Sequence, residues 1–313
     1  MSDTSFAADM MTQAAARRAD RRRFMKNAGV AGVAGLGVLG ASQMAATNVF
    51  AQSAPTDADV LNFALNLEYL EAEFYVRAAF GRGLAAGDTT GTGTLGGVTG
   101  GRAVSFATEA IRQYAVEIAA DEEAHVRFLR AALGTATVAR PAINIESAFT
   151  AAARAAGLVG PTATFDAYAN ENNFLLAAFI FEDVGVTAYK GASPLITNRT
   201  FLEAAAGLLA VEAYHASLLR TVLFARGLSA PVQAISNARD SLDGTSDLDQ
   251  GILDGNRSAN IVPTDASGLA FSRTANQVLN IVYLTPQAAT SGGFFPQGVN
   301  GTLNTSGSPA QNG

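Results

Sequence analysis

The chain contains two histidines, and each of them follows a glutamate by three residues. Glu122 precedes His125 in the stretch AADEEAHVRFL, and Glu212 precedes His215 in VEAYHASLL. Both stretches are compatible with an α-helix, on which residues three apart project from the same face. The two Glu-x-x-His pairs therefore predict two helices that each turn one carboxylate and one imidazole in the same direction.

Four segments have the apolar periodicity of long amphipathic helices: residues 58–80, 105–133, 165–190 and 198–226. The first and third place a glutamate, Glu68 and Glu182, in the middle of the apolar stripe. The stripes of the second and fourth segments match around their Glu-x-x-His pairs. The sequence thus predicts an all-α fold, a four-helix bundle with acidic groups on its inward faces.

Two halves of the bundle repeat one another. Glu68 has a tyrosine seven residues on, Tyr75, and Glu182 has Tyr189 at the same spacing. Helix 3 therefore corresponds to helix 1, and helix 4 to helix 2. The two tyrosines are candidate catalytic residues, as redox-active phenols. The alternatives are hydrogen-bond donors to the glutamates, or core residues with one hydrogen bond.

Six side chains should converge on the bundle axis and form a site for two divalent metal ions. Four carboxylates balance the charge of two such ions. Oxygen ligands with two imidazoles favour iron or manganese. The alternative is a metal-free bundle, but the stripes carry no lysine or arginine to neutralise the acids. The predicted ligands are Glu68, Glu122, His125, Glu182, Glu212 and His215.

Other acids surround these ligands. Glu71 lies one turn from Glu68, as an extra ligand or in a salt link at the bundle rim. Four flanking acids point off the stripes and are expected in solvent: Glu73, Asp121, Glu123 and Asp183. The acidic stretch 243–251 weakly resembles a calcium loop but lacks the terminal bidentate glutamate, which favours an acidic surface turn.

Between the helices, residues 81–101 are rich in glycine and are expected to form a loop at the end of the bundle. Residues 135–161 are long enough to cross over between helices 2 and 3, with a short helical piece at 146–156. We assign residues 52–230 to the bundle. Residues 231–313 form a mostly irregular C-terminal extension with one further helix, at about 271–284.

The N-terminal 51 residues have the pattern of a twin-arginine signal peptide. RRRFMK at 21–26 precedes a weakly apolar run at 28–46, and Val49, Phe50 and Ala51 suit a signal peptidase. A transmembrane anchor is the alternative, but glycines make the run weakly hydrophobic. The predicted location is therefore periplasmic or secreted, with cleavage near Gln52.

Composition excludes several classes of function. The chain has no cysteine, which excludes disulfides, thiolate metal sites and iron–sulfur clusters. Six of its 21 basic side chains, but three of its 27 acidic ones, lie in the first 51 residues, so the remainder is acidic. An acidic surface disfavours nucleic acid and anionic membranes as partners. A homo-oligomer remains compatible with the composition.

Several stretches resemble the ferritin-like superfamily, and in particular the secreted ferritin-like domain proteins that include plant desiccation-related proteins. The resemblance implies a ferritin-like bundle with a di-metal centre held by the six residues named above. It leaves the reaction open, and the long crossover and C-terminal extension differ from iron-storage ferritins. The stretches are LNFALNLEYLEAEFY, DEEAHVRFL, FEDVGVTAYKGA, VEAYHASLLR, NIVPTD, FSRTANQVLNIVYL and GGFFPQGVNG.

Three functions follow as hypotheses. The first is an exported di-metal oxidoreductase that acts on a small-molecule oxidant, peroxide or dioxygen, in oxidative or desiccation stress. The second is a non-enzymatic stress protein that binds metal. The third is a ferroxidase with iron storage. Peroxide turnover separates the first from the second, and a large assembly with a mineral core would indicate the third.

Overall fold

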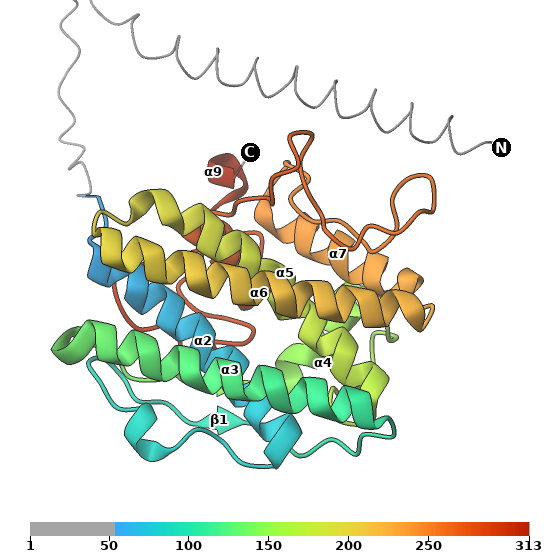
Figure 1. Ribbon diagram of the computed structural model, residues 1–313, viewed down its shortest axis with the longest axis horizontal. Helices are drawn as coiled ribbons and strands as arrows, with labels where there is room; N and C mark the ends of the chain where they lie inside the picture. The colour runs from blue at the N-terminus through green and yellow to red at the C-terminus, as the bar shows by residue number, and fades with distance from the viewer. Residues whose placement is uncertain (1–53, 313) are drawn as a thin grey trace, which may run out of the picture. The chain divides into compact units, whose positions relative to one another are not determined.

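The computed structural model describes residues 54–312, so the predicted signal peptide, residues 1–51, lies outside the described residues. Four long helices form two antiparallel hairpins (Figure 1), α2 (Asp57–Phe80) with α3 (Glu109–Leu133) and α5 (Glu171–Ala192) with α6 (Arg199–Ala225). The prediction of an all-α four-helix bundle with a long connection between helices 2 and 3 is confirmed. Residues 264–269 form a separate short loop, closed by a hydrogen bond from the Asp265 N–H to the Leu269 carbonyl.

The helix ends follow from capping side chains. Thr56 begins α2 with a capping box in which its side chain and that of Asp59 each accept from the other's backbone N–H. Gly81, in a left-handed conformation with φ 69°, ends the same helix. The third helix was predicted to begin at residue 165, but Asn170 caps it by accepting from Asn173 N–H, so α5 begins six residues later.

Two connections, the loop after α2 and the crossover between α3 and α5, run along the side of the bundle. Thr92 N–H donates to Thr137 O, and β1 (Val98–Thr99) pairs in parallel with β2 (Ile143–Asn144). Residues 89–99 of the expected loop are therefore paired with the crossover, and the predicted place of this part at the bundle end is wrong. The other short elements here are η1 (Ala86–Asp88), η2 (Gly134–Ala136) and α4 (Ser147–Ala155).

The C-terminal part contains more helix than predicted. Beside α8 (Ala275–Tyr283), the described residues include α7 (Ser229–Asp243) and α9 (Pro309–Asn312), so the prediction of one further helix is wrong. Pro231 occupies the first turn of α7, where a backbone N–H has no partner within the helix and proline is tolerated. The predicted boundary after residue 230 falls inside α7.

A network of buried ion pairs joins this extension to α5 and α6. Arg220 Nη1 of α6 lies 2.7 Å from Asp183 Oδ2 of α5, which also lies 3.1 Å from Arg239 Nη2 of α7. Arg273 Nε and Nη2 reach Asp243 at 2.5 Å and Asp249 at 2.8 Å. The predictions of a solvated Asp183 and an acidic surface turn at 243–251 are therefore wrong, because arginines distant in sequence bury these acids.

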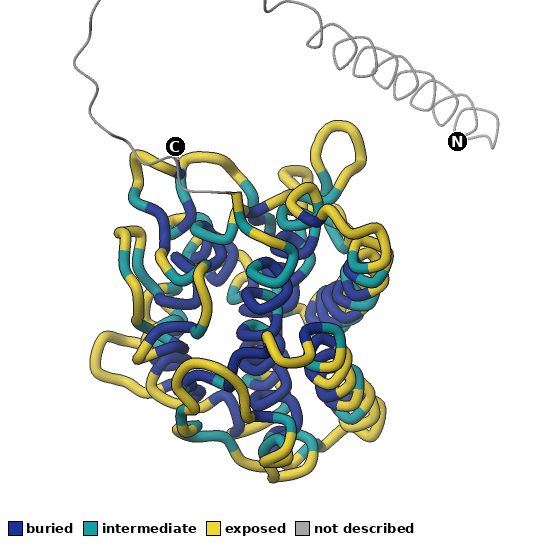
Figure 2. The backbone as a smooth tube through the Cα atoms, turned by 90° about the vertical axis from the view of Figure 1, so that its left-hand side faces the viewer, coloured by how far each residue is buried: buried dark blue, intermediate teal, exposed yellow. Residues whose placement is uncertain are grey.

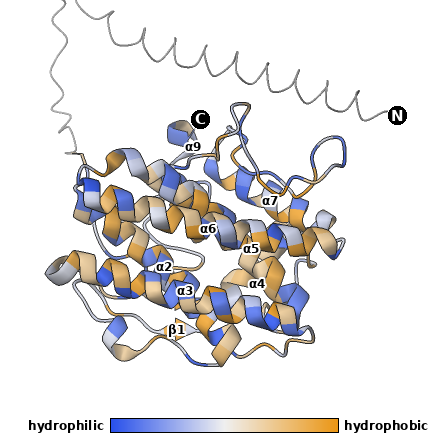
Figure 3. Ribbon diagram, viewed as in Figure 1, coloured by the Kyte–Doolittle hydropathy of each residue, from blue (hydrophilic) through white to orange (hydrophobic). Residues whose placement is uncertain are grey.

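The core lies between the long helices, whose inner sides are buried and outer sides exposed (Figure 2). Hydrophobic and hydrophilic residues alternate along each long helix (Figure 3). Among residues 54–312, α6 is the helix long and apolar enough to cross a membrane by length and composition, with mean hydropathy 1.3 in its most apolar window. A core helix passes the same test, so this is weak evidence for a membrane span.

We predict that Arg273→Ala lowers the free energy of unfolding by about 3–5 kcal/mol, because it leaves Asp243 buried without its ion-pair partner and leaves Asp249 with Arg239 alone. Arg112→Ala is the control, since its ion pair with Glu109 is exposed on both sides and should contribute little. Denaturant unfolding of both variants measures the difference. Equal stabilities would contradict a structural role for the buried network.

Candidate metal centre

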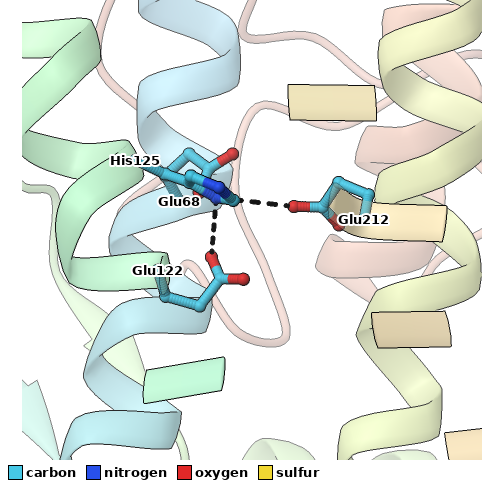
Figure 4. Close-up of side chains that lie close together, drawn as sticks. All are labelled: Glu68, Glu122, His125 and Glu212. Atoms are coloured by element: carbon cyan, nitrogen blue, oxygen red, sulfur yellow. Dashed lines mark hydrogen bonds and ion pairs between the residues drawn. The ribbon is translucent and has the colours of Figure 1, made fainter. Parts of the chain in front are cut away.

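One group of potential ligands gathers around His125 (Figure 4). Its Nδ1 lies 3.2 Å from Glu68 Oε2 of α2, 3.6 Å from Glu122 Oε2 on its own helix and 3.9 Å from Glu212 Oε1 of α6. Three helices thus supply one nitrogen and three carboxylates to a space in which their atoms lie within 4.8 Å of one another. All four residues are buried.

A second group gathers around His215, and it shares Glu122 with the first. His215 Nδ1 lies 3.2 Å from Glu122 Oε1 and 3.5 Å from Glu182 Oε2. The two imidazole centroids are 6.3 Å apart. Since one oxygen of Glu122 faces each histidine, this carboxylate has the position of a bridge between two cations. The structure therefore brings all six predicted ligands together, from four helices.

The two tyrosines connect the halves of the bundle. The Tyr75 hydroxyl donates to Glu182 Oε1, and the Tyr189 hydroxyl donates to Glu68 Oε1. Burial, together with the neighbouring carboxylates, raises the pKa of both phenols well above that of free tyrosine, so each keeps its proton. Each tyrosine thus orients the glutamate of the other half, as the donor alternative expected.

The centre contains more acceptors than the protein can satisfy. Both oxygens of Glu122 and of Glu212, one oxygen of Glu182 and Nδ1 of His215 are buried without an aligned hydrogen bond among the described residues. Buried polar groups are normally paired, so this convergence of unpaired oxygens and nitrogens is compatible with the binding of divalent cations. The donor set of carboxylates and imidazoles fits divalent iron or manganese.

The pKa shifts of these residues arise from the same burial of several carboxylates close together. Burial, followed by the charge of Glu122, raises the pKa of Glu68 to about 7. Burial opposes protonation of His125, but the charge of Glu68 and the contact with Glu122 raise its pKa to about 11. Burial also raises the pKa of Glu212 well above its usual range. In the metal-free chain, protons therefore occupy the places of cations.

Glu71 is neither at the rim nor in a salt link. Its side chain is buried, and burial with the charges of Glu122 and Glu182 raises its pKa well above the usual range. It does not belong to either group of converging ligand atoms. The salt-link alternative for Glu71 is thus wrong.

Sequence reasoning missed the partner of His215. Asp121 Oδ2 lies 3.1 Å from His215 Nε2, so this acid orients the outer nitrogen of the ring, while its side chain remains 44% exposed in accord with the expectation that it lies in solvent. Glu73 and Glu123 were also expected in solvent, but they are buried and paired with arginines. The sequence did offer a reason to look for such an acid. If one ring nitrogen of His215 binds a metal, the other ring nitrogen needs a hydrogen-bond partner.

Gly185 was missed as well. A Cβ at this position would lie 2.1 Å from Glu212 Oε2, so only glycine lets that carboxylate approach α5. An isolated glycine in the middle of an apolar helix was the available signal, because glycine there costs stability and usually has a packing reason.

A helical bundle with two Glu-x-x-His pairs and two further glutamates at its centre defines the class of carboxylate- and histidine-lined helical metal bundles. Residues 56–225 match the family model of the ferritin-like domain. The chain belongs to this ferritin-like family.

Two relatives cover most of the chain. It is 31% identical over 268 residues to desiccation-related protein PCC13-62 of Craterostigma plantagineum, a match that spans 79% of this chain and 83% of that protein. It is 28% identical over 269 residues to ferritin-like catalase Nec2 of Nesocodon mauritianus, spanning 79% and 84%. No solved structure matches the chain.

We predict that the metal-free chain loses stability as pH rises from about 5 to about 9. The folded-state pKa of Glu68 is raised from 4.5 to about 7, and that of His125 from 6.5 to about 11. In both windows the folded state binds more protons than the unfolded state, so the free energy of unfolding falls as pH rises. Denaturant unfolding over this pH range measures it.

The metal-loaded chain is the control for this pH dependence. Metal ions replace the protons, so its stability should change much less over the same range, and metal binding at pH 7 should release protons. Calorimetric titrations in two buffers with different ionisation enthalpies count them. Equal pH dependence of both forms, with no proton release, would show that the cluster does not exchange protons for metal.

Proposed function

We propose that this chain is an exported dinuclear protein that holds two iron or manganese ions and carries out redox chemistry on peroxide or dioxygen. The observation that carries the proposal is the shared carboxylate of Glu122, with one oxygen 3.2 Å from His215 Nδ1 and the other 3.6 Å from His125 Nδ1. A carboxylate in this position suits two cations held side by side.

The similarity to a protein named ferritin-like catalase supports the choice of peroxide. When bound, two redox-active ions supply a two-electron exchange without an organic cofactor. Catalase chemistry converts two molecules of hydrogen peroxide into two of water and one of dioxygen, so it needs no other reductant. This balance suits a chain that offers no cysteine for thiol chemistry.

The residues of the chain have separate tasks in this proposal. Six side chains hold the ions. Tyr75 and Tyr189 keep Glu182 and Glu68 in place by hydrogen bonds and retain their own protons. The surrounding core excludes bulk water, which strengthens every charge interaction at the centre.

We predict two metal ions per wild-type chain and a loss of both, or of the second, in Glu122→Gln, because the amide cannot bridge two cations as a carboxylate does. Glu117→Gln is the matched control, since Glu117 lies on the same helix but is exposed. Elemental analysis of purified protein gives the metal content. One metal or none in the wild type would overturn the dinuclear proposal.

We predict that the protein loaded with manganese or iron releases dioxygen from peroxide or reoxidises with dioxygen. Tyr75→Phe should keep both metals but turn over several-fold more slowly, because Glu182 loses the donor that orients it. An oxygen electrode and elemental analysis measure the two properties. If neither metal supports a reaction in the wild type, the non-enzymatic metal-binding function replaces this proposal.

Iron storage is the remaining alternative. It predicts a large homo-oligomer with a mineral core after iron loading, which light scattering and electron microscopy would detect. Bulk iron uptake by such an assembly would favour a ferroxidase over a catalase.

The proposed location and partners rest on the sequence. The arginine-rich start, with its weakly apolar run, supports export by the twin-arginine route to the periplasm or beyond. The acidic body supports a small-molecule oxidant as partner and disfavours nucleic acid and anionic membranes. The similarity to a desiccation-related protein supports a role in stress.

A further inference from the structure

A cleft lies along α4, between this helix and the segments at 101–102 and 164–168. This α4 cleft has a volume of about 530 Å³, within the roughly 300–1,000 Å³ of small-molecule sites. Its lining contains none of the six metal ligands, so it is separate from the metal centre. The lining residues used below are Arg102, Glu146, Thr150, Arg154, Asp166 and Tyr168.

Hydrogen bonds fix the two walls of the α4 cleft relative to each other. Thr150 Oγ1 of α4 donates to the Phe165 carbonyl at 3.1 Å and accepts from the Phe165 N–H at 3.2 Å. Arg154 Nε donates to the Ala163 carbonyl at 2.9 Å. The cleft is therefore formed before a ligand binds, which lowers the ordering cost of binding.

Two opposite charges in the α4 cleft have no protein partner. Among residues 54–312, neither the Nη atoms of Arg154 nor the carboxylate of Glu146 forms a hydrogen bond or an ion pair. Glu146 is the N-cap of α4, and Arg154 lies eight residues further on, about 12 Å away at 1.5 Å per residue. Because Arg154 Nε is tied to the Ala163 carbonyl, the free edge of the guanidinium group is held in place. A fixed guanidinium edge suits a carboxylate ligand.

A buried phenol in the same lining has no acceptor. Tyr168 is 5% exposed, and its hydroxyl is buried without a hydrogen-bond partner among the described residues. Burial raises the pKa of this phenol above its usual value, so the hydroxyl keeps its proton and can donate it to a hydrogen bond. Buried hydroxyl groups are normally paired, so Tyr168 offers a donor to an oxygen atom of a ligand.

The charges of the lining balance, and this selects the class of ligand. Arg102 and Asp166 neutralise each other through hydrogen bonds of 3.0 and 2.5 Å, and Arg154 and Glu146 add one charge of each sign. The cleft therefore suits a ligand without net charge that carries a separated anion and cation. A short peptide with free termini has both, together with carbonyl oxygens. At about 3.3–3.6 Å per residue, three extended residues span roughly 10 Å, close to the spacing of the two free charges.

We propose that the α4 cleft binds short peptides with free termini. Arg154 holds the terminal carboxylate, Glu146 holds the terminal ammonium group, and the Tyr168 hydroxyl donates to a peptide carbonyl. Binding makes and breaks no covalent bond. The site does not depend on the metal centre, so it can be tested in the metal-free and in the metal-loaded chain.

Trialanine is the probe for the first test, by isothermal titration calorimetry with the full chain. Arg154→Gln and Glu146→Gln should each weaken its binding about tenfold, because each removes a charge-assisted contact. Arg199→Gln and Glu203→Gln are the matched controls, since both residues are exposed on α6 and lie outside the cleft. A wild-type chain that does not bind trialanine, or equal effects of all four substitutions, would overturn the proposal.

Capped peptides assign each terminus to its residue. Amidated trialanine lacks the carboxylate, so it should bind about tenfold more weakly than trialanine to the wild type but equally to Arg154→Gln. Acetylated trialanine lacks the ammonium group and should show the same pattern with Glu146→Gln. Effects of capping that are unchanged in the two variants would contradict the proposed contacts.

Sucrose serves as a neutral probe that carries hydroxyl groups and no charge. It should not bind to the α4 cleft. Sucrose binding that both cleft variants weaken, without trialanine binding, would identify a carbohydrate site and reject the peptide.

Tyr168→Phe tests the phenol. It should weaken trialanine binding several-fold without lowering the free energy of unfolding, since the hydroxyl that it removes has no protein partner. Tyr283→Phe is the control with the opposite pattern, because the Tyr283 hydroxyl donates to the Asn304 carbonyl and accepts from the Val299 N–H. This control should lose stability and keep the affinity for trialanine. Unchanged affinity in Tyr168→Phe would overturn the placement of the peptide in this cleft.

Discussion

The burial of many acids in one helical bundle is the constraint on which the rest of the structure depends. Glu68, Glu71, Glu122, Glu182 and Glu212 are all nearly inaccessible to solvent, and water cannot stabilise their charges there. Among residues 54–312, no arginine or lysine forms an ion pair with any of the five; the contacts within ion-pair distance come from two histidines. The centre is therefore neutralised by protons when it is metal-free and by cations when it is loaded.

Arginine neutralises a second, outer set of acids, and this explains why the connections and the extension pack where they do. Arg140 comes from the crossover and, with Arg77, pairs with Glu73 of α2. Arg239 and Arg220 pair with Asp183 of α5. A guanidinium group can satisfy a buried carboxylate only with several hydrogen bonds in good geometry, so these segments have to pack closely on the bundle. The extension is consequently a part of the core.

The difference between the inner acids of the centre and the outer, arginine-paired acids explains which residues could be predicted from the sequence. The six ligands repeat at helical spacing within single helices, so periodicity alone placed them on one face. The roles of Glu73 and Asp183 were missed because their partners come from segments distant in sequence, which no helical stripe contains. Helix α7 was missed because the extension was expected to be irregular from residue 231 on, although proline at that position is compatible with the first turn of a helix. Gly185 required knowledge of which side chain approaches α5, and that depends on tertiary packing.

The repeat of the two halves is not complete, and the difference makes the surroundings of His125 and His215 unequal. His215 has Asp121 against its outer nitrogen, and Asp121 directly precedes Glu122. The residue that directly precedes Glu212 is Val211, which has no acceptor to offer the other histidine. A carboxylate behind an imidazole fixes the orientation of the ring, so the imidazole of His215 is the more firmly oriented of the two. The group around His125 includes Glu212, whose carboxylate approaches α5 at Gly185. The two histidines of the centre are thus not equivalent, although the sequence pattern around them repeats.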